Sequence, residues 1–311
     1  MENIIDKMIK KSIEKNTVLI VGLDPNLQNF PKFLTESINN DYKDPKNLEK
    51  IENAIFNFNK IVIDATFEHS LGIKPQLAYY EIFGSYGIKA LERTIDYAKT
   101  KDLFIINDGK RGDIGSTSKV YAEAFLGDTL ISGDMVTVNP YLGEDSYNPF
   151  IEYANKFNKG LFILVKTSNH SSKDIQDLII KDKNEPVYID LAKKLSEISN
   201  VNKGEYGYSS IGAVIGATYP KIVKKLRTIL KHNAFLVPGY GFQGAKAADL
   251  KVCFDKNGNG AFIVSARSII FSYLEKKYNK NISTLTEKEM TEIIKEKAIF
   301  SKDELNLTRF N

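Results

Sequence analysis

The amino-acid sequence predicts a closed (β/α)8 barrel of the TIM type, and three observations support this fold class. Eight short runs are continuously apolar, as in parallel strands that are covered on both faces. Segments with apolar residues at three- and four-residue steps lie between most of them, which indicates right-handed strand–helix–strand units. Eight such strands in about 250 residues suit a closed barrel better than an open sheet.

Each expected strand is an apolar run that is followed by polar or glycine-rich residues. In chain order these runs cover 17–24, 71–75, 102–108, 134–140, 161–167, 211–218, 234–241 and 260–267. The expected helices cover 46–69, 86–99, 118–125, 148–157, 187–198, 219–230 and 268–278. Because no linker or change of composition divides the chain, we expect residues 1–311 to form a single catalytic domain.

Three segments fall outside this repeat. Near the start, Ile4, Ile5, Met8, Ile9 and Ile13 share one face, which predicts an amphipathic helix rather than a signal peptide. Near the end, Thr286 and Glu289 have the spacing of a capping box, so we expect a terminal helix there. After the fifth strand, the polar insertion 168–186 is expected to form a mobile loop over the active site.

The composition is that of a soluble globular protein, with 42% hydrophobic and 26% charged residues in 311. The net charge of +4 comes from scattered lysines, so we expect no binding to nucleic acid or membranes. No apolar run approaches the ~18 residues that span a bilayer. The one cysteine, Cys253, is expected to be a small buried residue, and the protein is expected in the cytoplasm.

In a parallel barrel, the site forms at the carboxyl ends of the strands. The polar residues at these ends are Asp24, Lys74, Asp108, Lys110, Asn139, Lys166 or Thr167, Thr218, Gln243 and Arg267. Charged groups at a barrel mouth are costly unless they pair, and alternating aspartates and lysines provide such pairing. A purely structural ion network is the alternative to a catalytic one.

The most informative stretch is IINDGKRGDIGST, residues 105–117. In an extended backbone, Asp108 and Lys110 point the same way, and Asp113 follows after a short turn. Nearby carboxylates favour the charged ammonium form of a lysine, whereas Schiff-base chemistry needs the neutral amine. We therefore expect Lys110 to donate a proton or to stabilise developing negative charge.

A second stretch, VPGYGFQGAK at 237–246, contains the G-x-G-x-x-G pattern of dinucleotide-binding loops. It follows the seventh strand rather than the first, and no acidic residue follows at the expected distance. Loops after strands seven and eight of such barrels commonly bind phosphate. Gly241 would allow close backbone approach, and Gln243 and Arg267 would supply donors. An ordinary surface arginine is the alternative for Arg267.

These motifs resemble the orotidine 5′-phosphate decarboxylase family. DGKRGDIGST resembles its D-x-K-x-x-D signature, VGLDP at 21–25 its first-strand aspartate motif, and IKPQLAYYE at 73–81 its second-strand lysine. PGYGFQG together with VSARS resembles its phosphate loop and phosphate arginine. The resemblance covers most of residues 15–280, and the long insertions are similar to those of the type 2 branch.

The resemblance implies conversion of orotidine 5′-monophosphate to UMP and carbon dioxide in pyrimidine biosynthesis, with neither a metal nor an organic cofactor. Lys110 would protonate C6 of the pyrimidine, and Asp108 would lie beside the substrate carboxylate. Lys74 and Asp24 would complete the charged array and contact the ribose.

The same resemblance implies a homodimer with shared active sites, in which Asp113 and Thr117 enter the site of the neighbouring subunit. Thr167 or Ser168 would read the edge of the pyrimidine. The remaining substrate-binding residues are those of the phosphate segments, Pro238, Gly241, Gln243 and Arg267.

Two alternative functions remain open at this point. Magnesium-dependent decarboxylases or aldolases of the same barrel family, acting on sugar phosphates, share D-x-K-x-x-D but have a glutamate where Lys74 stands. A non-catalytic protein that binds a phosphosugar or a nucleotide is the other, since fold alone does not determine function. The intact charged set disfavours this second alternative.

Overall fold

Among the residues that the structure describes, 2–201, 203–241, 246–278 and 281–310, eight parallel strands close into a barrel. This computed structural model confirms the predicted (β/α)8 fold. The barrel strands are β1 (Leu19–Leu23), β2 (Gly72–Pro75), β3 (Phe104–Arg111), β4 (Met135–Val138), β5 (Gly160–Lys166), β8 (Ser209–Ile215), β9 (Asn233–Val237) and β10 (Ala261–Ser265). Around the barrel they follow the order β1-β10-β9-β8-β5-β4-β3-β2. A short antiparallel pair, β6 (Ile179–Ile180) and β7 (Glu185–Pro186), lies in the insertion.

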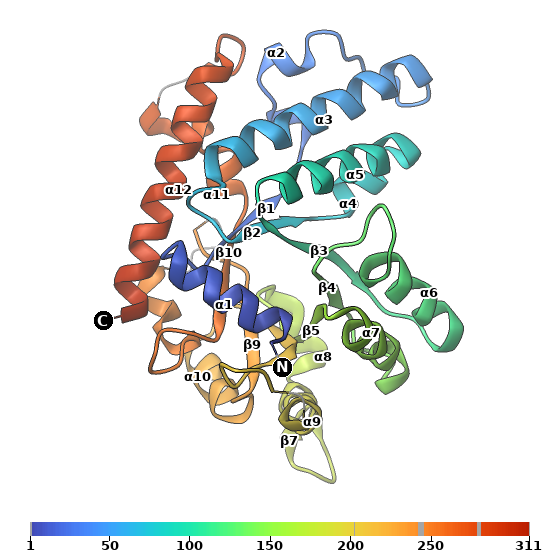
Figure 1. Cartoon of the computed structure of the whole chain (residues 1–311), viewed down its shortest axis with the longest axis vertical. Helices are drawn as coiled ribbons and strands as arrows, with labels where there is room; N and C mark the ends of the chain where they lie inside the picture. The colour runs from blue at the N-terminus through green and yellow to red at the C-terminus, as the bar shows by residue number, and fades with distance from the viewer. Residues whose placement is uncertain (1, 202, 242–245, 279–280, 311) are drawn as a thin grey trace.

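Helices surround the barrel on all sides in Figure 1. They are α1 (Ile4–Glu14), α2 (Lys32–Thr35), α3 (Pro45–Thr66), α4 (Ala78–Glu81), α5 (Gly84–Thr100), α6 (Gly115–Leu126), α7 (Glu144–Phe157), α8 (Lys173–Gln176), α9 (Val187–Val201), α10 (Pro220–Ile229), α11 (Arg267–Ile270) and α12 (Glu287–Phe310). Short 3-10 turns are η1 (Leu27–Asn29), η2 (His170–Ser172), η3 (Ala247–Cys253), η4 (Ser272–Leu274) and η5 (Lys276–Tyr278). The terminal helix α12 begins with the predicted capping box, in which the Glu289 amide donates to Thr286 Oγ1 at 3.3 Å.

One predicted helix is wrong. The segment 268–278 was expected to be continuous, but α11 ends at Ile270 and two 3-10 turns follow it. Phe271 and Tyr273 are both buried, and Phe271 packs against Phe58 of α3 with ring centroids 5.5 Å apart. Packing on several sides therefore overrides the helical periodicity of this segment, whose β-branched and aromatic residues have modest helix propensity.

The alternation of side chains along each strand brings the charged residues to one end of the barrel interior. Val21 of β1 belongs to the outer core, between the strands and the helices. Ile20 of β1 and Ile106 of β3 belong to the inner core instead. Because side chains alternate with a period of two, counting by twos from these isoleucines leads to Asp24 and Asp108 at the carboxyl ends.

Helix α1 closes the opposite end of the barrel, crossing in front of the strands in Figure 1. Its residues Ile4, Ile5, Met8 and Ile9 are buried and belong to the inner core together with the strand residues. Ile13 was predicted on the same face but is 56% exposed. In the last turn of α1, the buried position is occupied by Ser12 instead.

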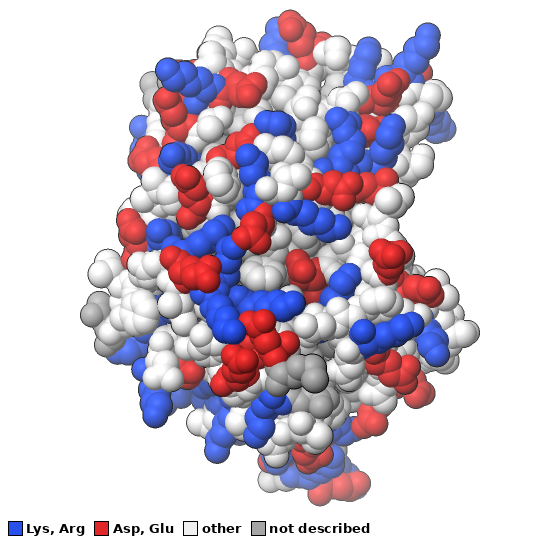
Figure 2. Space-filling view, viewed as in Figure 1, with Lys and Arg blue, Asp and Glu red and all other residues white. Residues whose placement is uncertain are grey.

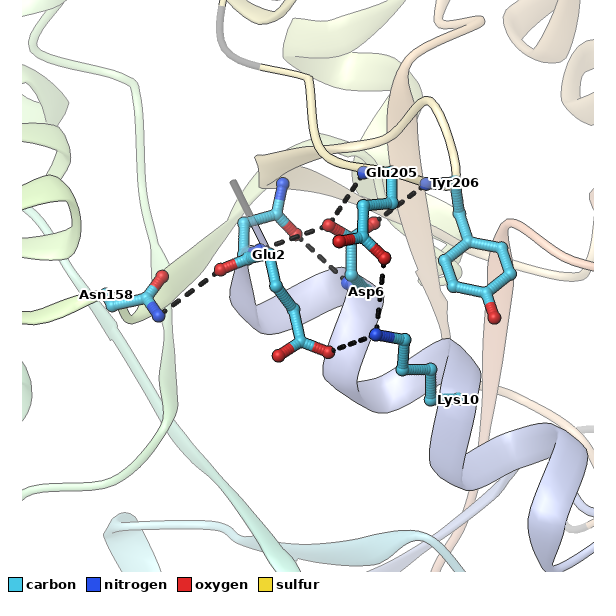
Figure 3. Close-up of polar contacts among 7 residues, drawn as sticks. Glu2, Asp6, Lys10, Asn158, Glu205 and Tyr206 are labelled. Atoms are coloured by element: carbon cyan, nitrogen blue, oxygen red, sulfur yellow. Dashed lines mark hydrogen bonds and ion pairs between the residues drawn. The ribbon is translucent and has the colours of Figure 1, made fainter.

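The fully buried carboxylate of Asp6 joins α1 to the segment that precedes β8 (Figure 3). One oxygen accepts hydrogen bonds from the backbone N–H groups of Asn3 at 3.1 Å and Glu205 at 2.8 Å. The other accepts from the Tyr206 N–H at 3.0 Å. A Cβ atom on Gly204 would lie only 1.9 Å from the Asp6 carboxylate, so the close approach of this backbone requires glycine.

The surface carries charges of both signs. On the face that Figure 2 shows, lysine and arginine side chains are interspersed with aspartate and glutamate. Within the described ranges, no helix combines the length and the apolar character that crossing a bilayer requires. Cys253 is buried as predicted, and burial raises the pKa of its thiol to about 12, with Arg227 opposing that shift.

We predict that Asp6→Ala lowers the free energy of unfolding by about 3 kcal/mol, because it removes a fully buried carboxylate and leaves three backbone N–H groups without their acceptor. Urea unfolding followed by circular dichroism measures this change. The control is Lys10→Ala, which removes only the exposed ion pairs with Glu2 and Glu205 in the same view (Figure 3). A loss of stability no larger than that of the control would contradict the assigned role of Asp6.

Candidate active site

A cavity of about 930 Å³ lies at the carboxyl ends of the barrel strands. Most of the residues predicted for the site line it, namely Asp24, Lys74, Asp108, Lys110, Thr167, Ser168, Pro238 and Arg267. Asn139, another of the predicted strand-end residues, lines it as well. The barrel therefore brings together residues that are up to about 240 positions apart in the sequence, as expected when the ends of all strands meet at one face.

Asp108, only 5% exposed at the end of the barrel interior, is the centre of the polar network in this cavity. Its Oδ2 is ion-paired with the Lys74 ammonium and accepts a hydrogen bond from Gln76 Nε2 at 3.0 Å. Its Oδ1 accepts from Lys110 Nζ at 2.6 Å and from Thr137 Oγ1 at 2.9 Å. Each carboxylate oxygen thus has two donors, which satisfies a charge that would otherwise be very costly to bury.

The two aspartates of the site have pKa values shifted in opposite directions. Burial alone would raise the pKa of Asp108, but the ammonium groups of Lys74 and Lys110 outweigh burial and hold that pKa well below its usual range. Burial raises the pKa of Asp24; Lys74 opposes this shift, whereas the Asp108 carboxylate adds to it. Asp108 is therefore held as an anion, and Asp24 takes up a proton more readily than an ordinary aspartate.

The backbone at Lys110 differs from the prediction. We expected an extended strand, but the pairing of β3 with β4 changes register between Asn107 and Arg111, and Lys110 has a φ of 47°. This left-handed conformation costs a non-glycine residue about 1 kcal/mol or more and is typical of functional sites. The Lys110 N–H donates to Thr137 Oγ1 at 2.9 Å, which stabilises the bulge. The side chain still reaches Asp108, as predicted, but through a bulge rather than an extended strand.

Two polar residues of the network were missed in the sequence. Gln76 and Thr137 both contact Asp108, and both line the cavity. A signal for each was present: Gln76 follows Lys74 by two positions, and Thr137 is a polar residue inside the apolar run of β4. Counted by twos along their strands, both positions point into the barrel, as Asp108 does.

The segments after β9 and β10, predicted to bind phosphate, lie against each other. Gly241 has a φ of 83°, and a Cβ there would lie 2.7 Å from Ser268 Oγ, next to Arg267. Tyr240, which directly precedes Gly241, is buried, and its hydroxyl donates a hydrogen bond to Glu304 of α12. The terminal helix therefore supports the loop that carries Gly241.

The other predicted residues either do not line this cavity or lie outside the described residues. Gln243 lies outside the described residues. Asp113 is half-buried, and its Oδ1 accepts from the Ile114 N–H at 2.7 Å; Thr117 is exposed at the start of α6. In the described part of the chain, Asp113, Thr117 and Gly241 are not among the residues that line the cavity. Thr218, another strand-end residue, does not line it either.

The insertion after β5 forms one wall of the cavity. Ser168, Ile175 and Gln176 line it on this side. The Thr167 N–H donates to Gln176 Oε1 at 3.0 Å, and Gln176 Nε2 donates to Thr167 Oγ1 at 2.8 Å. The polar edge formed by residues 167 and 168 is thus held by a residue of the insertion itself.

The arrangement is suited to the chemistry of anions. Lys110 has a side chain that is 45% exposed towards the cavity, whereas that of Lys74 is only 8% exposed. A cation fixed beside a buried carboxylate can stabilise negative charge that develops on a ligand and can then supply a proton. Among the described residues, no group of three or more His, Cys, Asp or Glu side chains is placed to hold a metal ion.

Comparisons with known proteins agree with this geometry. The chain is 42% identical over 287 residues to an orotidine 5′-phosphate decarboxylase of Clostridium tetani, covering 92% of this chain and 94% of the relative. It is 40% identical over 281 residues to the enzyme of the same name from Caldicellulosiruptor bescii, covering 88% and 91% of the two chains. The solved structure of Leishmania donovani OMP decarboxylase has a TM-score of 0.73 and 26% sequence identity, covering 98% of each chain.

The model of one family matches residues 17–279, which span all eight barrel strands and every charged residue of the cavity. The family match covers most of the chain, and these relatives are 40% and 42% identical to it over nearly their whole length. The motifs of the sequence predicted the same family. This chain belongs to the orotidine 5′-phosphate decarboxylase / HUMPS family.

Proposed function

We propose that this protein converts orotidine 5′-monophosphate to UMP and carbon dioxide, without a metal or an organic cofactor. The observation that supports this most directly is the buried Asp108 carboxylate, held between the ammonium groups of Lys74 and Lys110 at the cavity. The names of the relatives agree with this activity. Because the substrate is a free nucleotide, we expect the protein to act in the cytoplasm.

In this reaction, the bond between C6 and the carboxylate breaks, and its electron pair stays on C6 as carbon dioxide leaves. No carbonyl of the pyrimidine is positioned to delocalise that pair. The ammonium of Lys110 stabilises the charge as it develops and transfers a proton to C6, which forms the C6–H bond of UMP. The neutral amine of Lys110 then regains a proton from water.

Lys110, rather than Lys74, is the proton donor in this proposal, because the side chain of Lys74 is almost fully buried against Asp108. Lys74 balances the charge of Asp108 and, with Asp24, contacts the ribose. Asp108 lies beside the substrate carboxylate. The fixed negative charge of Asp108 disfavours that carboxylate relative to the departing carbon dioxide, which carries none.

The two ends of the nucleotide bind to different loops in this proposal. Thr167 or Ser168 hydrogen-bonds to the edge of the pyrimidine. The phosphate is held by residues of the segments after β9 and β10, Pro238, Gly241, Gln243 and Arg267. Binding energy from the phosphate, far from C6, is then available to fix the pyrimidine against Lys110.

We also propose a homodimer in which Asp113 and Thr117 enter the site of the partner subunit. Asp113 lies between β3 and α6, Thr117 lies in the first turn of α6, and neither lines the cavity of its own chain. Apolar side chains near these residues and on the loop after β4 are strongly exposed, namely Ile114, Val120, Tyr141 and Leu142. Exposed apolar groups of this kind indicate a surface that a second copy covers.

The first test follows the absorbance of orotidine 5′-monophosphate with purified protein in excess EDTA. We expect turnover at the same rate with and without the chelator, because Lys74 stands where the magnesium-dependent relatives have a glutamate. Loss of turnover on chelation would support the sugar-phosphate alternative. Binding of UMP without any turnover would support a non-catalytic protein.

Lys110→Ala should lower kcat by on the order of 10²- to 10⁴-fold, because it removes the proton donor. The affinity for UMP, measured by calorimetry, should change by less than about tenfold, since most of the nucleotide's contacts remain. Lys231→Ala, at an exposed lysine between α10 and β9, serves as the control. Near-normal turnover in Lys110→Ala would refute the role of this amine.

Mixing inactive Lys110→Ala and Asp113→Ala proteins should restore activity, because a hybrid dimer contains one site with both residues intact. With random exchange, half of the dimers are hybrids, so the mixture should reach about a quarter of wild-type activity. Mass spectrometry of differently tagged subunits checks the exchange. If hybrids form and activity does not return, the sites are not shared.

A further inference from the structure

Lys166, the last residue of β5, is a buried cation that the proposed reaction does not use. Its side chain is 2% exposed. The pairing of β5 with β8 changes register between Leu164 and Lys166, and Lys166 is not among the described residues that line the cavity, although Thr167 is. The irregularity therefore turns the lysine away from the cavity and towards the insertion.

Both hydrogen-bond acceptors of this ammonium belong to the insertion. Nζ donates to Asp177 Oδ1 at 2.6 Å and to Ser172 Oγ at 3.2 Å. The rings of Tyr188 and Tyr219 flank it, each with a centroid 5.4 Å from Nζ. A buried ammonium is very costly without such partners, so the lysine fixes the two ends of the short segment from Ser172 to Asp177.

The residue next to Asp177 contacts the edge that faces the pyrimidine in our proposal. Gln176 hydrogen-bonds to both the backbone and the hydroxyl of Thr167. On the other side, a Cβ on Gly216 would lie 2.6 Å from the Ser168 nitrogen, so the end of β8 presses closely against this segment. The position of Thr167, which precedes Ser168 in the chain, thus depends on where Gln176 is held.

We propose that the Lys166–Asp177 ion pair is a positioning device for base recognition, which holds Gln176 and thereby the wall formed by residues 167 and 168. This inference rests on the proposed function, because it assumes that this wall faces the pyrimidine. Neither Lys166 nor Asp177 lines the cavity, so both are positioning residues rather than catalytic ones. In the described part of the chain, no residue of the segments after β9 and β10 hydrogen-bonds to Lys166, Asp177, Gln176 or Thr167.

The pair should therefore affect the base and the phosphate of a ligand unequally. Removing the charge of Asp177 breaks the strongest contact of Lys166 and frees the segment that carries Gln176. The pyrimidine then loses a preorganised wall, which weakens binding because the wall must be ordered when the ligand binds. A ligand that has the sugar and the phosphate but no base is unaffected by this change.

The experiment compares UMP with ribose 5-phosphate by calorimetry in wild type and Asp177→Asn. We expect Asp177→Asn to weaken UMP binding about tenfold, as for the loss of one charge-assisted hydrogen bond. Binding of ribose 5-phosphate should stay within about twofold. Asp177→Glu, which keeps the charge, should retain most of the UMP affinity. Asp174→Asn, at an exposed residue of α8 three positions before Asp177, is the matched control.

Equal weakening of both ligands would overturn the proposal, because it would mean a general structural role. UMP affinity unchanged in Asp177→Asn would overturn it as well. If the substituted protein does not fold, as thermal unfolding would reveal, Lys166→Arg replaces it, with UMP weakened and ribose 5-phosphate spared as the expected result. These binding measurements do not require turnover, so a failure of the wild type to decarboxylate would count against the proposed function alone.

Discussion

The site depends on one constraint, which is that a carboxylate buried at a barrel mouth must be surrounded by donors. Asp108 meets this constraint with four of them, two ammonium groups, an amide and a hydroxyl. Each donor comes from a strand or from its end, so the closed barrel supplies the convergence that no single loop could supply. The same contacts that make the buried charge tolerable also place Lys110 at the cavity with its proton in reach of a ligand. In the proposed function, the stability of the site and its chemistry are therefore two effects of one network.

The two ends of the barrel differ, since the amino-terminal end is filled and the carboxyl end holds the cavity. At the amino-terminal end, α1 fills the interior with aliphatic side chains, and the Asp6 carboxylate is bound by backbone N–H groups alone. At the carboxyl end, the strand positions that point into the barrel carry charged side chains instead of aliphatic ones. The closing of one end allows the other to stay open without losing the core. The insertion after β5 and the helix α12 then support the open end from outside, through Lys166 and through Tyr240.

Much of this arrangement could be predicted from the sequence, because it follows from periodicity. Continuous apolar runs identified every barrel strand, and their ends identified Asp24, Lys74 and Asp108. What could not be predicted depends on contacts between distant segments. The break in helix 268–278 comes from the packing of Phe271 against α3, and the bulge at Lys110 comes from pairing with β4. Gln76 and Thr137 were missed although their positions in the sequence gave a signal, because each is neutral and its importance shows only in its contact with Asp108.

The left-handed backbone at Lys110 has a consequence for how this chain can change over time. Glycine or asparagine would relax a φ of 47°, yet either would remove one of the four donors of the buried Asp108 carboxylate. The backbone conformation and the pairing of Asp108 therefore favour different residues at one position. Because a buried charge that loses a partner costs more than the strained backbone, a random substitution at this position should weaken the fold even where it relieves the strain.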